Sequence, residues 1–361
     1  MRCVAVGTGS YAEAMGKAGA ARKLAAAAAY GGGGLSVAGA GLFAVIAAEA
    51  RIARRLIGRI DDPVPDSTGW YGRVRPGPAI RIALLGDSTA TGYGVSTVEE
   101  TTGAQLGAGV SQVSGRRVFV RRLSRVGARS VELPGQVERA LPMHADVAVI
   151  LVGANDVTHG TLPSASVRAL AEAVRSLRAV GIQVVVGTCP DLGTVRPIAP
   201  PLKQLARLWS RRLAAAQTIA TVEAGGRSVS LSDILGPEFD AEPGELFGPD
   251  RFHPSARGYA SLAAVLVPSV LASLGLGRDE EGHPTATRGE SVMPIARAAV
   301  RATKTPGAEL EGTEIAGREH GASGRWVTLM RRRRHTTTAE APSAAAPEPD
   351  SHEGTPGPSE D

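Results

Sequence analysis

Short apolar runs alternate along the middle of the chain with longer amphipathic segments. The short runs predict strands at residues 79–85, 117–123, 145–152, 183–187 and 228–231. The longer segments predict helices at residues 99–114, 130–140, 164–180, 202–224 and 256–274. Strands that alternate with helices are typical of a parallel sheet, and the continuously apolar run VAVILV is typical of a strand covered on both faces. The pattern therefore predicts an α/β domain.

The chain on either side of this pattern has a different composition. Residues 1–60 form an Ala- and Gly-rich leader, and residues 61–78 are rich in Asp, Pro and Gly without a sustained apolar period, which predicts a linker. The alternating strands and helices occupy residues 79–275, which we interpret as one domain. Residues 276–361 are rich in Pro, Ala, Ser, Thr, Glu and Gly and hold too few apolar side chains to bury a core, so we predict a disordered tail.

Within the leader, residues 24–48 carry no charged side chain and have basic residues on both sides. This run is long enough to span a bilayer, which predicts an uncleaved membrane anchor. Two alternatives stay open. Ala48-Glu49-Ala50 has the small-x-small form of a signal-peptidase site, and four consecutive Gly residues favour a soluble leader. We expect a membrane-anchored or exported protein whose folded domain lies outside the cytoplasm, with a cytoplasmic protein as the alternative.

Charge and cysteine content exclude several classes of site. The net charge is +5 and the isoelectric point is near 9.5, but the Arg residues are scattered and their densest run, at 331–334, falls in the predicted tail. A folded groove for nucleic acid is therefore not expected. Cys3 and Cys189 are too few for a disulfide framework or a cysteine-based metal site within one chain. The sequence has no Walker A motif, so a nucleotide-binding domain is not indicated.

Polar residues follow two of the predicted strands, at the edge of the sheet where α/β proteins bind their ligands. Ser88 ends the string Gly-Asp-Ser just after the first strand, and a serine in a strand-to-helix turn presents its hydroxyl as a nucleophile. Asn155, in the string Gly-Ala-Asn-Asp after the third strand, carries an amide that can donate a hydrogen bond to a developing oxyanion. The first and third strands are neighbours in the flavodoxin-like order, so we expect the two side chains to meet.

A histidine and an aspartate follow the last predicted strand. His253 comes three residues after Asp250. We predict that His253 is the general base for Ser88, and that Asp250 fixes its tautomer and stabilises the imidazolium. His159, four residues after Asn155, is the competing base.

Other residues at this edge are expected to support the site. Asp87 is predicted to bind backbone amides and order its turn, and Asp156 to fix the loop that carries the asparagine. Asp191 is predicted to cap a turn after the fourth strand, with a place in the pocket wall as the alternative. Cys189 is expected to be a small buried residue.

Together, these strings resemble the four sequence blocks of the SGNH (GDSL-type) hydrolase superfamily, in the order of that family. The matching residues are Gly86-Asp87-Ser88, Gly127, Gly153-x-Asn155-Asp156 and Asp250-x-x-His253. The resemblance covers residues 78–275, and stretches such as VGANDVTH and DRFHPSARGYA are similar to an actinobacterial SGNH/GDSL esterase branch. Two positions match the family less well than the others. Thr89 stands where the family has Leu, and Gly127 is also explained as a plain turn glycine.

The resemblance implies a three-layer α/β/α, flavodoxin-like fold with a five-stranded parallel sheet. It implies an oxyanion hole made by the Ser88 N–H, the Gly127 N–H and the Asn155 side chain, with Gly153 and Asp156 in supporting or pocket positions. The implied reaction is ester hydrolysis through an acyl-enzyme, with no metal and no other cofactor.

We therefore expect a carboxylic ester hydrolase that acts on short-chain acyl or acetyl esters. The alternatives are an O-acetyl deacetylase or acyltransferase for cell-envelope polysaccharide, and a binding module without enzymatic activity. The expected partners are an ester of a small molecule, glycan or lipid, and a membrane that binds the N-terminal segment. The oligomeric state stays open.

Overall fold

The computed structural model describes residues 37–57, 63–195, 198–231, 246–276, 292–304, 307–311, 314–315, 318–319 and 325–329. The strands are β1 (Gly69–Tyr71), β2 (Ile80–Gly86), β3 (Val118–Arg122), β4 (Val147–Leu151), β5 (Gln183–Gly187), β6 (Arg227–Val229), β7 (Val292–Pro294), β8 (Glu309–Glu311), β9 (Glu314–Ile315), β10 (Arg318–Glu319) and β11 (Arg325–Leu329). The helices are α2 (Val37–Leu56), α3 (Ser88–Thr91), α4 (Thr102–Ser114), α5 (Leu133–Ala140), α6 (Ala154–Thr158), α7 (Pro163–Ala179), α8 (Leu202–Glu223), α11 (Ala256–Ser273) and α12 (Ile295–Ala302). Short 3-10 helices are η1 (Ser130–Glu132), η2 (Leu141–Met143) and η3 (Leu192–Thr194).

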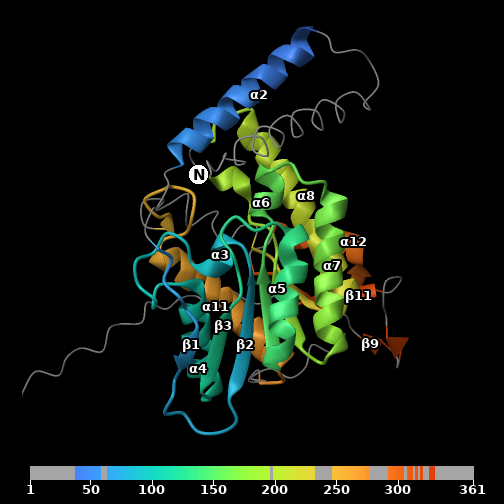
Figure 1. The fold of residues 1–361 in the computed structure, drawn as a ribbon. Helices are drawn as coiled ribbons and strands as arrows, with labels where there is room; N and C mark the ends of the chain where they lie inside the picture. Colours follow the sequence, from blue (N-terminus) through green and yellow to red (C-terminus); the bar gives the residue numbers. More distant parts are fainter. Residues whose placement is uncertain are drawn as a thin grey trace, which may run out of the picture. The chain divides into compact units, whose positions relative to one another are not determined.

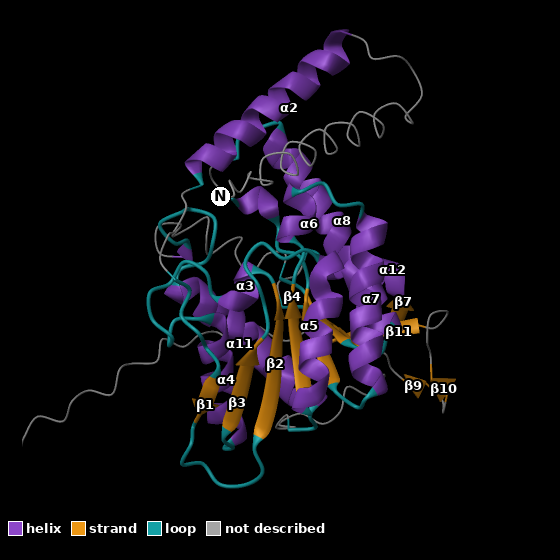
Figure 2. Cartoon of the chain, viewed as in Figure 1, coloured by secondary structure: helices purple, strands orange, loops and turns teal. Residues whose placement is uncertain are grey.

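The central strands run parallel, in the order β3-β2-β4-β5-β6. Figure 1 shows β3 beside β2. The order is the flavodoxin-like one, in which the first strand of the domain lies between the second and the third. It places the carboxyl ends of β2 and β4 side by side (Figure 2), and Gly86 pairs with Leu151 in the register of the two strands. The predicted α/β fold with a five-stranded parallel sheet is therefore confirmed, and antiparallel strands extend the sheet at both edges.

The core lies on both faces of the sheet, because successive side chains of a strand point to opposite faces. Ile82 and Leu84 of β2 pack in one cluster with apolar side chains of α4 and α11. Ala83 and Leu85 pack in a second cluster with side chains of α5 and α7. β4 is buried at every position, and a strand buried on both faces must be apolar throughout, which explains why its sequence shows no alternation.

Residues 61–78, predicted as a linker, contain the edge strand β1. It pairs antiparallel with β3, and the rings of Trp70 and Phe119 lie 5.1 Å apart between their centroids. The Arg122 guanidinium donates a hydrogen bond to the Asp66 carboxylate at 3.1 Å. Three residues are too few to reveal a strand period in the sequence, so this strand could not be predicted from the pattern.

Part of the segment predicted as a disordered tail adds to the opposite edge of the sheet. β8 pairs antiparallel with β6, and α12 contacts α8. Leu310 of β8 and Ala298 of α12 are buried together with Val222 of α8. The prediction of disorder is thus corrected for residues 292–304 and 307–311, whose few apolar side chains gain burial by joining an existing sheet edge. Residues 331–361 lie outside the described residues.

The predicted membrane segment, residues 24–48, overlaps the first part of α2, and residues 24–36 lie outside the described residues. α2 continues to Leu56. The Glu49 carboxylate accepts a hydrogen bond from the Leu202 N–H, at the start of α8, at 2.9 Å. Of the helices that the structure describes, α11 is the one long and apolar enough to cross a membrane, and half of it is buried, as in a core helix. The membrane anchor therefore stays a prediction.

Candidate active site

The turn that carries Ser88 begins where β2 ends. Gly86 has a φ of 130°, and a Cβ on it would lie 1.8 Å from the carbonyl oxygen of Leu151 in β4, so this position requires glycine. The Asp87 carboxylate caps α3 by accepting a hydrogen bond from the Thr89 N–H at 2.9 Å. Burial raises the pKa of Asp87 to about 6, although the bonds from Thr89 act in the opposite direction. The Asp87 carboxylate therefore binds a backbone amide of the turn that carries Ser88.

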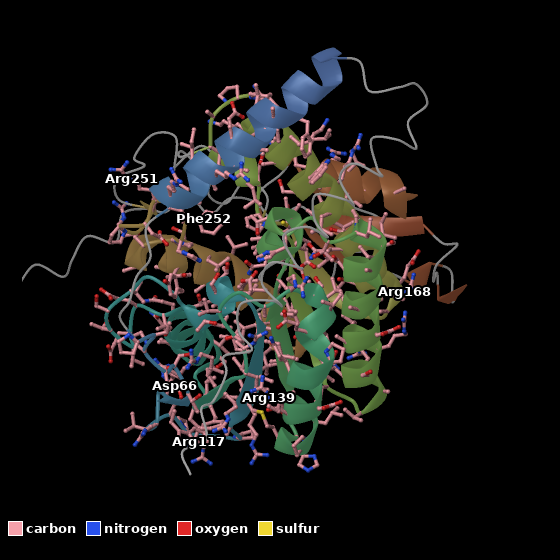
Figure 3. The ribbon with its side chains drawn as sticks, turned by 45° about the horizontal axis from the view of Figure 1, so that its top comes forward. Asp66, Arg117, Arg139, Arg168, Arg251 and Phe252 are labelled. Carbon is pink, nitrogen blue, oxygen red and sulfur yellow. The ribbon has the colours of Figure 1, made fainter. Side chains whose placement is uncertain are left out.

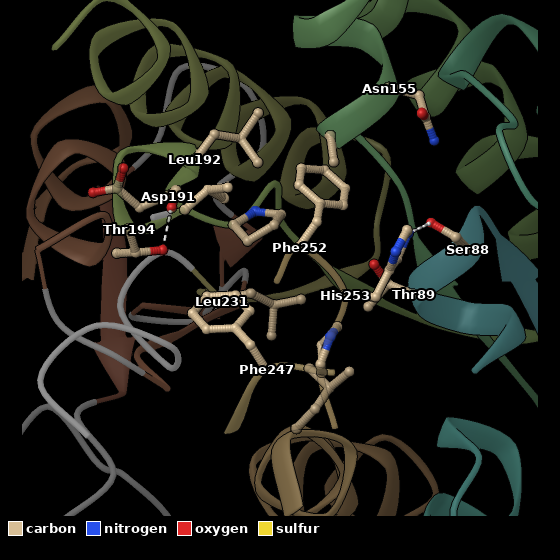
Figure 4. A pocket seen from close by; sticks show the side chains of 15 residues that line it. Ser88, Thr89, Asn155, Asp191, Leu192, Thr194, Leu231, Phe247, Phe252 and His253 are labelled. Carbon is tan, nitrogen blue, oxygen red and sulfur yellow. Dashed lines mark hydrogen bonds between the residues drawn. The ribbon is translucent and has the colours of Figure 1, made fainter. Parts of the chain in front are cut away.

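His253 lies between Ser88 and Asp250. Its Nε2 is 2.9 Å from Ser88 Oγ (Figure 4). Its Nδ1 is 2.5 Å from Asp250 Oδ2. Burial alone raises the pKa of Asp250, but the hydrogen bond and charge of His253 and two backbone N–H groups outweigh it and hold the pKa below its ordinary value. An ionised Asp250 therefore faces the ring nitrogen opposite the one that contacts the serine.

We call residues 246–254 the base loop, because they carry His253 and Asp250. The Gly248 N–H donates to the His253 carbonyl oxygen at 2.8 Å, and Phe247 forms an isolated β-bridge with Pro254. These contacts close the loop on itself and hold the acid and the base in one rigid turn.

Two aromatic rings contact the imidazole of His253. The ring centroids of Tyr93 and Phe252 lie 4.6 Å and 4.9 Å from it, both in edge-on geometry. The neighbouring Arg251 has a φ of 59° and is exposed. Figure 3 shows Arg251 at the periphery of the molecule and Phe252 further in. The two rings restrict rotation of the imidazole and leave its Nε2 directed at the serine.

Asn155 lies beside the loop that contains Gly127. Its Nδ2 donates to the Ala128 carbonyl oxygen at 3.2 Å. The Ala128 N–H in turn donates to the Arg125 carbonyl oxygen at 3.1 Å, which closes a turn around Gly127, where φ is 79°. Glycine therefore serves the conformation of this turn. Asn155 and Ser88 line the same pocket (Figure 4).

Asp156 and Gly153 fix the segment that carries the asparagine. The buried Asp156 carboxylate accepts hydrogen bonds from the Ser130 N–H at 3.1 Å, the Ser130 hydroxyl at 2.8 Å and the Ser166 hydroxyl at 2.7 Å. Gly153 has a φ of 141°, and a Cβ on it would lie 2.8 Å from the Cβ of Cys189. Asp156 thus links the segment that carries Asn155 to Ser130 and Ser166, and Gly153 allows that segment to approach Cys189 closely.

His159, the competing base, is exposed at the end of α6. Its Nδ1 lies 2.9 Å from the Asn155 carbonyl oxygen and 3.3 Å from the Thr158 hydroxyl. The histidine whose ring contacts the Ser88 hydroxyl is His253.

Asp191 and Cys189 follow β5. Asp191 caps η3 by accepting a hydrogen bond from the Gly193 N–H at 2.8 Å, forms an ion pair with Arg211 at 2.9 Å, and also lines the pocket. Cys189 is fully buried, and burial raises the pKa of its thiol well above the ordinary value. A buried neutral thiol is not a nucleophile, so this cysteine is structural.

The pocket beside Ser88 and His253 has mostly apolar walls (Figure 4). Its apolar side chains include Leu192, Val195, Leu231, Phe247, Phe252 and Leu262. In the part of the chain that the structure describes, no three His, Cys, Asp or Glu residues gather in a cluster suited to a metal ion.

Two buried glutamines at the ends of the central strands were missed by sequence reasoning. Gln136 of α5 binds both the N–H and the carbonyl oxygen of Gly86. Gln217 of α8 binds the Val152 carbonyl oxygen and the Cys189 N–H. A polar residue on the apolar face of an amphipathic helix is the signal that could have pointed to them.

The sequence model of the GDSL-like lipase/acylhydrolase family matches residues 84–261. A GDSL-like esterase of Mycobacterium tuberculosis (strain ATCC 25618 / H37Rv) is 39% identical over 258 residues, which cover 68% of this chain and 81% of that protein. The chain belongs to the GDSL-like lipase/acylhydrolase family. The resemblance drawn from the sequence blocks and the prediction of a carboxylic ester hydrolase are thereby confirmed.

Solved structures with a similar fold include two esterases. A catalytic mutant of an acetylxylan esterase from Geobacillus stearothermophilus has 16% identity and a TM-score of 0.43, covering 56% of this chain and 97% of that one. The psychrotrophic esterase EstA from Pseudoalteromonas sp. has 16% identity and a TM-score of 0.45, covering 54% of this chain and 98% of that one. These similarities are too distant to inform the site.

Proposed function

We propose that the chain is a serine esterase that hydrolyses carboxylic esters through an acyl-enzyme, with Ser88 as nucleophile, His253 as general base and Asp250 as the orienting acid. One observation carries the proposal: the imidazole of His253 bridges the Ser88 hydroxyl, at 2.9 Å, and the Asp250 carboxylate, at 2.5 Å. Serine, histidine and aspartate in this order of contacts form a catalytic triad.

The triad moves one proton in two steps. His253 Nε2 takes the Ser88 hydroxyl proton as Oγ attacks the ester carbonyl carbon, and then gives that proton to the leaving alcohol. Water attacks the acyl-enzyme in the second half of the reaction, and His253 again acts first as base and then as acid. Asp250 stays ionised throughout, in agreement with the direction of its pKa.

We assign the oxyanion hole to the Ser88 N–H, the Gly127 N–H and the Asn155 amide. The Asn155 Nδ2 carries two hydrogens, and its bond to Ala128 uses one of them. The second hydrogen is left for the carbonyl oxygen of the substrate, on which negative charge develops in the transition state.

The apolar pocket walls support an ester with a short acyl chain or an acetyl group. Leu192, Val195 and Phe252 line the pocket together with Ser88 and can cover a few methylene groups. An O-acetyl deacetylase or an acyltransferase for envelope polysaccharide would use the same three side chains, and it differs in the alcohol or acceptor. A series of p-nitrophenyl esters of increasing acyl length, assayed with and without a sugar acceptor, separates these activities.

The test of the proposed chemistry is Ser88→Ala in the full-length protein, with Ser273→Ala as the matched control. Ser273 lies at the end of α11, where its hydroxyl donates to the Val270 carbonyl oxygen. We expect Ser88→Ala to reduce turnover of p-nitrophenyl acetate by about a thousandfold or more, and Ser273→Ala to leave turnover unchanged. A folded Ser88→Ala protein with wild-type turnover would refute the serine mechanism.

We further propose that the N-terminal segment holds the enzyme at a membrane, with the catalytic domain outside the cytoplasm. The uncharged run at 24–48 supports an anchor. In α2, the side chains of Leu42 and Phe43 are 53% and 44% exposed, and Arg51 and Arg55 are exposed as well. Apolar and basic side chains together suit the surface of a membrane with anionic lipids.

Fractionation of cells that express the full chain tests this proposal. We expect the protein in the membrane fraction, with its N-terminus intact and resistant to carbonate extraction. Intact protein wholly in the soluble fraction would contradict the anchor, and a mature chain that starts after residue 50 would favour a cleaved signal peptide.

A further inference from the structure

Gln136 makes an unusual pair of contacts at the end of β2. The residue is 3% exposed on the inner face of α5. Its Oε1 accepts a hydrogen bond from the Gly86 N–H at 2.7 Å, and its Nε2 donates one to the Gly86 carbonyl oxygen at 2.9 Å. The pairing of β2 with β3 ends at Leu84 and Arg122, before Gly86 is reached. The glutamine amide therefore takes the place of a neighbouring strand, two residues before Ser88.

The Gly86 carbonyl oxygen is also connected, through further hydrogen bonds, to the residues assigned to the oxyanion hole. Besides Gln136, the Gly86 oxygen accepts a hydrogen bond from the Arg125 N–H at 3.1 Å. The Arg125 oxygen accepts from the Ala128 N–H at 3.1 Å, and the Ala128 oxygen accepts from Asn155 Nδ2 at 3.2 Å. A continuous series of hydrogen bonds thus connects Gln136 to the Ser88 turn, to the loop of Gly127 and to Asn155.

Several hydrogen bonds hold the chain segment 125–140, including the one from the Arg125 N–H to the Gly86 carbonyl oxygen. Near its start, Ser130 donates two hydrogen bonds to the Asp156 carboxylate. Near its end, Gln136 holds Gly86. Loss of the Gln136 contacts leaves the bonds of Arg125 and Ser130 in place, so the segment stays folded. Gly86 then keeps one of its three hydrogen bonds to the segment, which lets the Ser88 turn shift relative to the loop of Gly127.

We propose that Gln136 is a positioning residue, which keeps the Ser88 turn and the loop of the oxyanion donors at a fixed mutual distance. This inference rests on the proposed serine esterase mechanism. Hydrogen bonds to the oxyanion strengthen only as charge develops, so a shift of the donors lowers kcat and leaves KM nearly unchanged. A residue that contributes to stability alone would lower the melting temperature without this split.

The test compares Gln136→Met with Gln217→Met in the full-length protein. Both glutamines are buried, and each loses two hydrogen bonds to the backbone in the substitution. Gln217 bonds the Val152 carbonyl oxygen after β4 and the Cys189 N–H after β5. In Gln217→Met, the segment that carries Asn155 keeps the hydrogen bonds of Asp156 to Ser130 and Ser166.

With p-nitrophenyl acetate, we expect Gln136→Met to lower kcat by about tenfold or more with KM within about twofold. Both substitutions should lower the melting temperature by similar amounts, because each removes two buried hydrogen bonds. Gln217→Met should keep kcat within about threefold of wild type. An equal loss of kcat in both variants, or unchanged kcat in Gln136→Met, would overturn the proposal.

Gln136→Glu provides a second variant if the methionine protein does not fold. An ionised glutamate keeps the acceptor for the Gly86 N–H and loses the donor, and a protonated one restores the donor. The ratio of its kcat to that of wild type should therefore rise as the pH is lowered, and a ratio independent of pH would contradict the positioning role. Failure of the mechanism itself is seen separately, as wild-type protein that neither hydrolyses the ester nor reacts with a fluorophosphonate.

Discussion

The base loop and the Ser88 turn face each other across one hydrogen bond, and they are held by contacts of very different range. In the base loop, one oxygen of Asp250 accepts from the N–H groups of Phe252 and His253, and the other holds the imidazole. Gly248 closes the loop on His253. Every one of these bonds joins residues within 246–254.

The Ser88 turn depends on partners far away in the sequence. Gly86 is held by Gln136, 50 residues later, and approaches the backbone of Leu151 in the neighbouring strand. A change in the base loop should therefore alter the chemistry and leave the fold intact. A change around the Ser88 turn should alter both.

The largest effect is expected from the base loop. His253→Ala should lower kcat/KM by about a thousandfold or more, because the imidazole of His253 is the base that contacts the Ser88 hydroxyl. Asp250→Ala should cost somewhat less, and the double variant should be little worse than His253→Ala, since the acid acts only through the base. Steady-state kinetics of the three variants checks this.

Additive losses in the double variant would show that Asp250 has an effect of its own. If His253→Ala retains activity and His159→Ala loses it, the base is His159 and the base loop is structural. Melting temperatures are the control. His253→Ala should melt near wild type, because the backbone contacts of the base loop remain, whereas Asp250→Ala also loses the hydrogen bonds from the N–H groups of Phe252 and His253 and should melt somewhat lower.

A smaller effect is expected on the other side of the site. Asn155→Ala should lower kcat by roughly a hundredfold with a modest change in KM, since its hydrogen bond strengthens only in the transition state. Thr158→Ala, at the exposed end of the same helix, is the matched control and should leave kcat unchanged. A large rise in KM with normal kcat would instead assign Asn155 to ground-state binding.

The smallest effect is expected on stability, where Asp87 in the Ser88 turn and Asp250 in the base loop should give different pH dependences. Burial raises the pKa of Asp87 to about 6, so the folded protein keeps a proton that the unfolded chain releases near 3.8. Relative to Asp87→Asn, wild type should lose up to about 3 kcal/mol of unfolding free energy as the pH rises from 3 to 7.

Asp250 should give the opposite sign. Its pKa is lowered in the folded protein, so its contribution to stability is present above 3.8 and is lost as the pH falls through the folded value. Chemical denaturation of wild type and of the Asp87→Asn and Asp250→Asn variants, at a series of pH values, measures both. Curves of the same sign would contradict the burial of Asp87 or the pairing of Asp250.

The range of contacts also explains what could be predicted from the sequence. Asp250 and His253 lie within four residues of each other, and Ser88 and Asn155 each follow an apolar strand, so position in the sequence is enough to predict all four as candidate site residues. From the sequence, Gln136 is one polar residue in a short helix, and nothing near it indicates its partner Gly86, which lies 50 residues earlier.

The same limit applies to the edges of the sheet. The central strands are apolar enough to be predicted individually, and their boundaries agree with the structure to within a few residues. β1 and β8 are three residues each and gain burial only through the strands that they pair with, β3 and β6. Pairing of this kind leaves no period in the local sequence.

The most direct measurement is the site of covalent modification after the full-length protein reacts with a fluorophosphonate, located by mass spectrometry of its peptides. We expect one adduct per chain, on Ser88, formed in parallel with the loss of esterase activity and much more slowly in His253→Ala. Complete loss of activity with Ser88 unmodified would contradict Ser88 as the nucleophile, and with it the proposed mechanism.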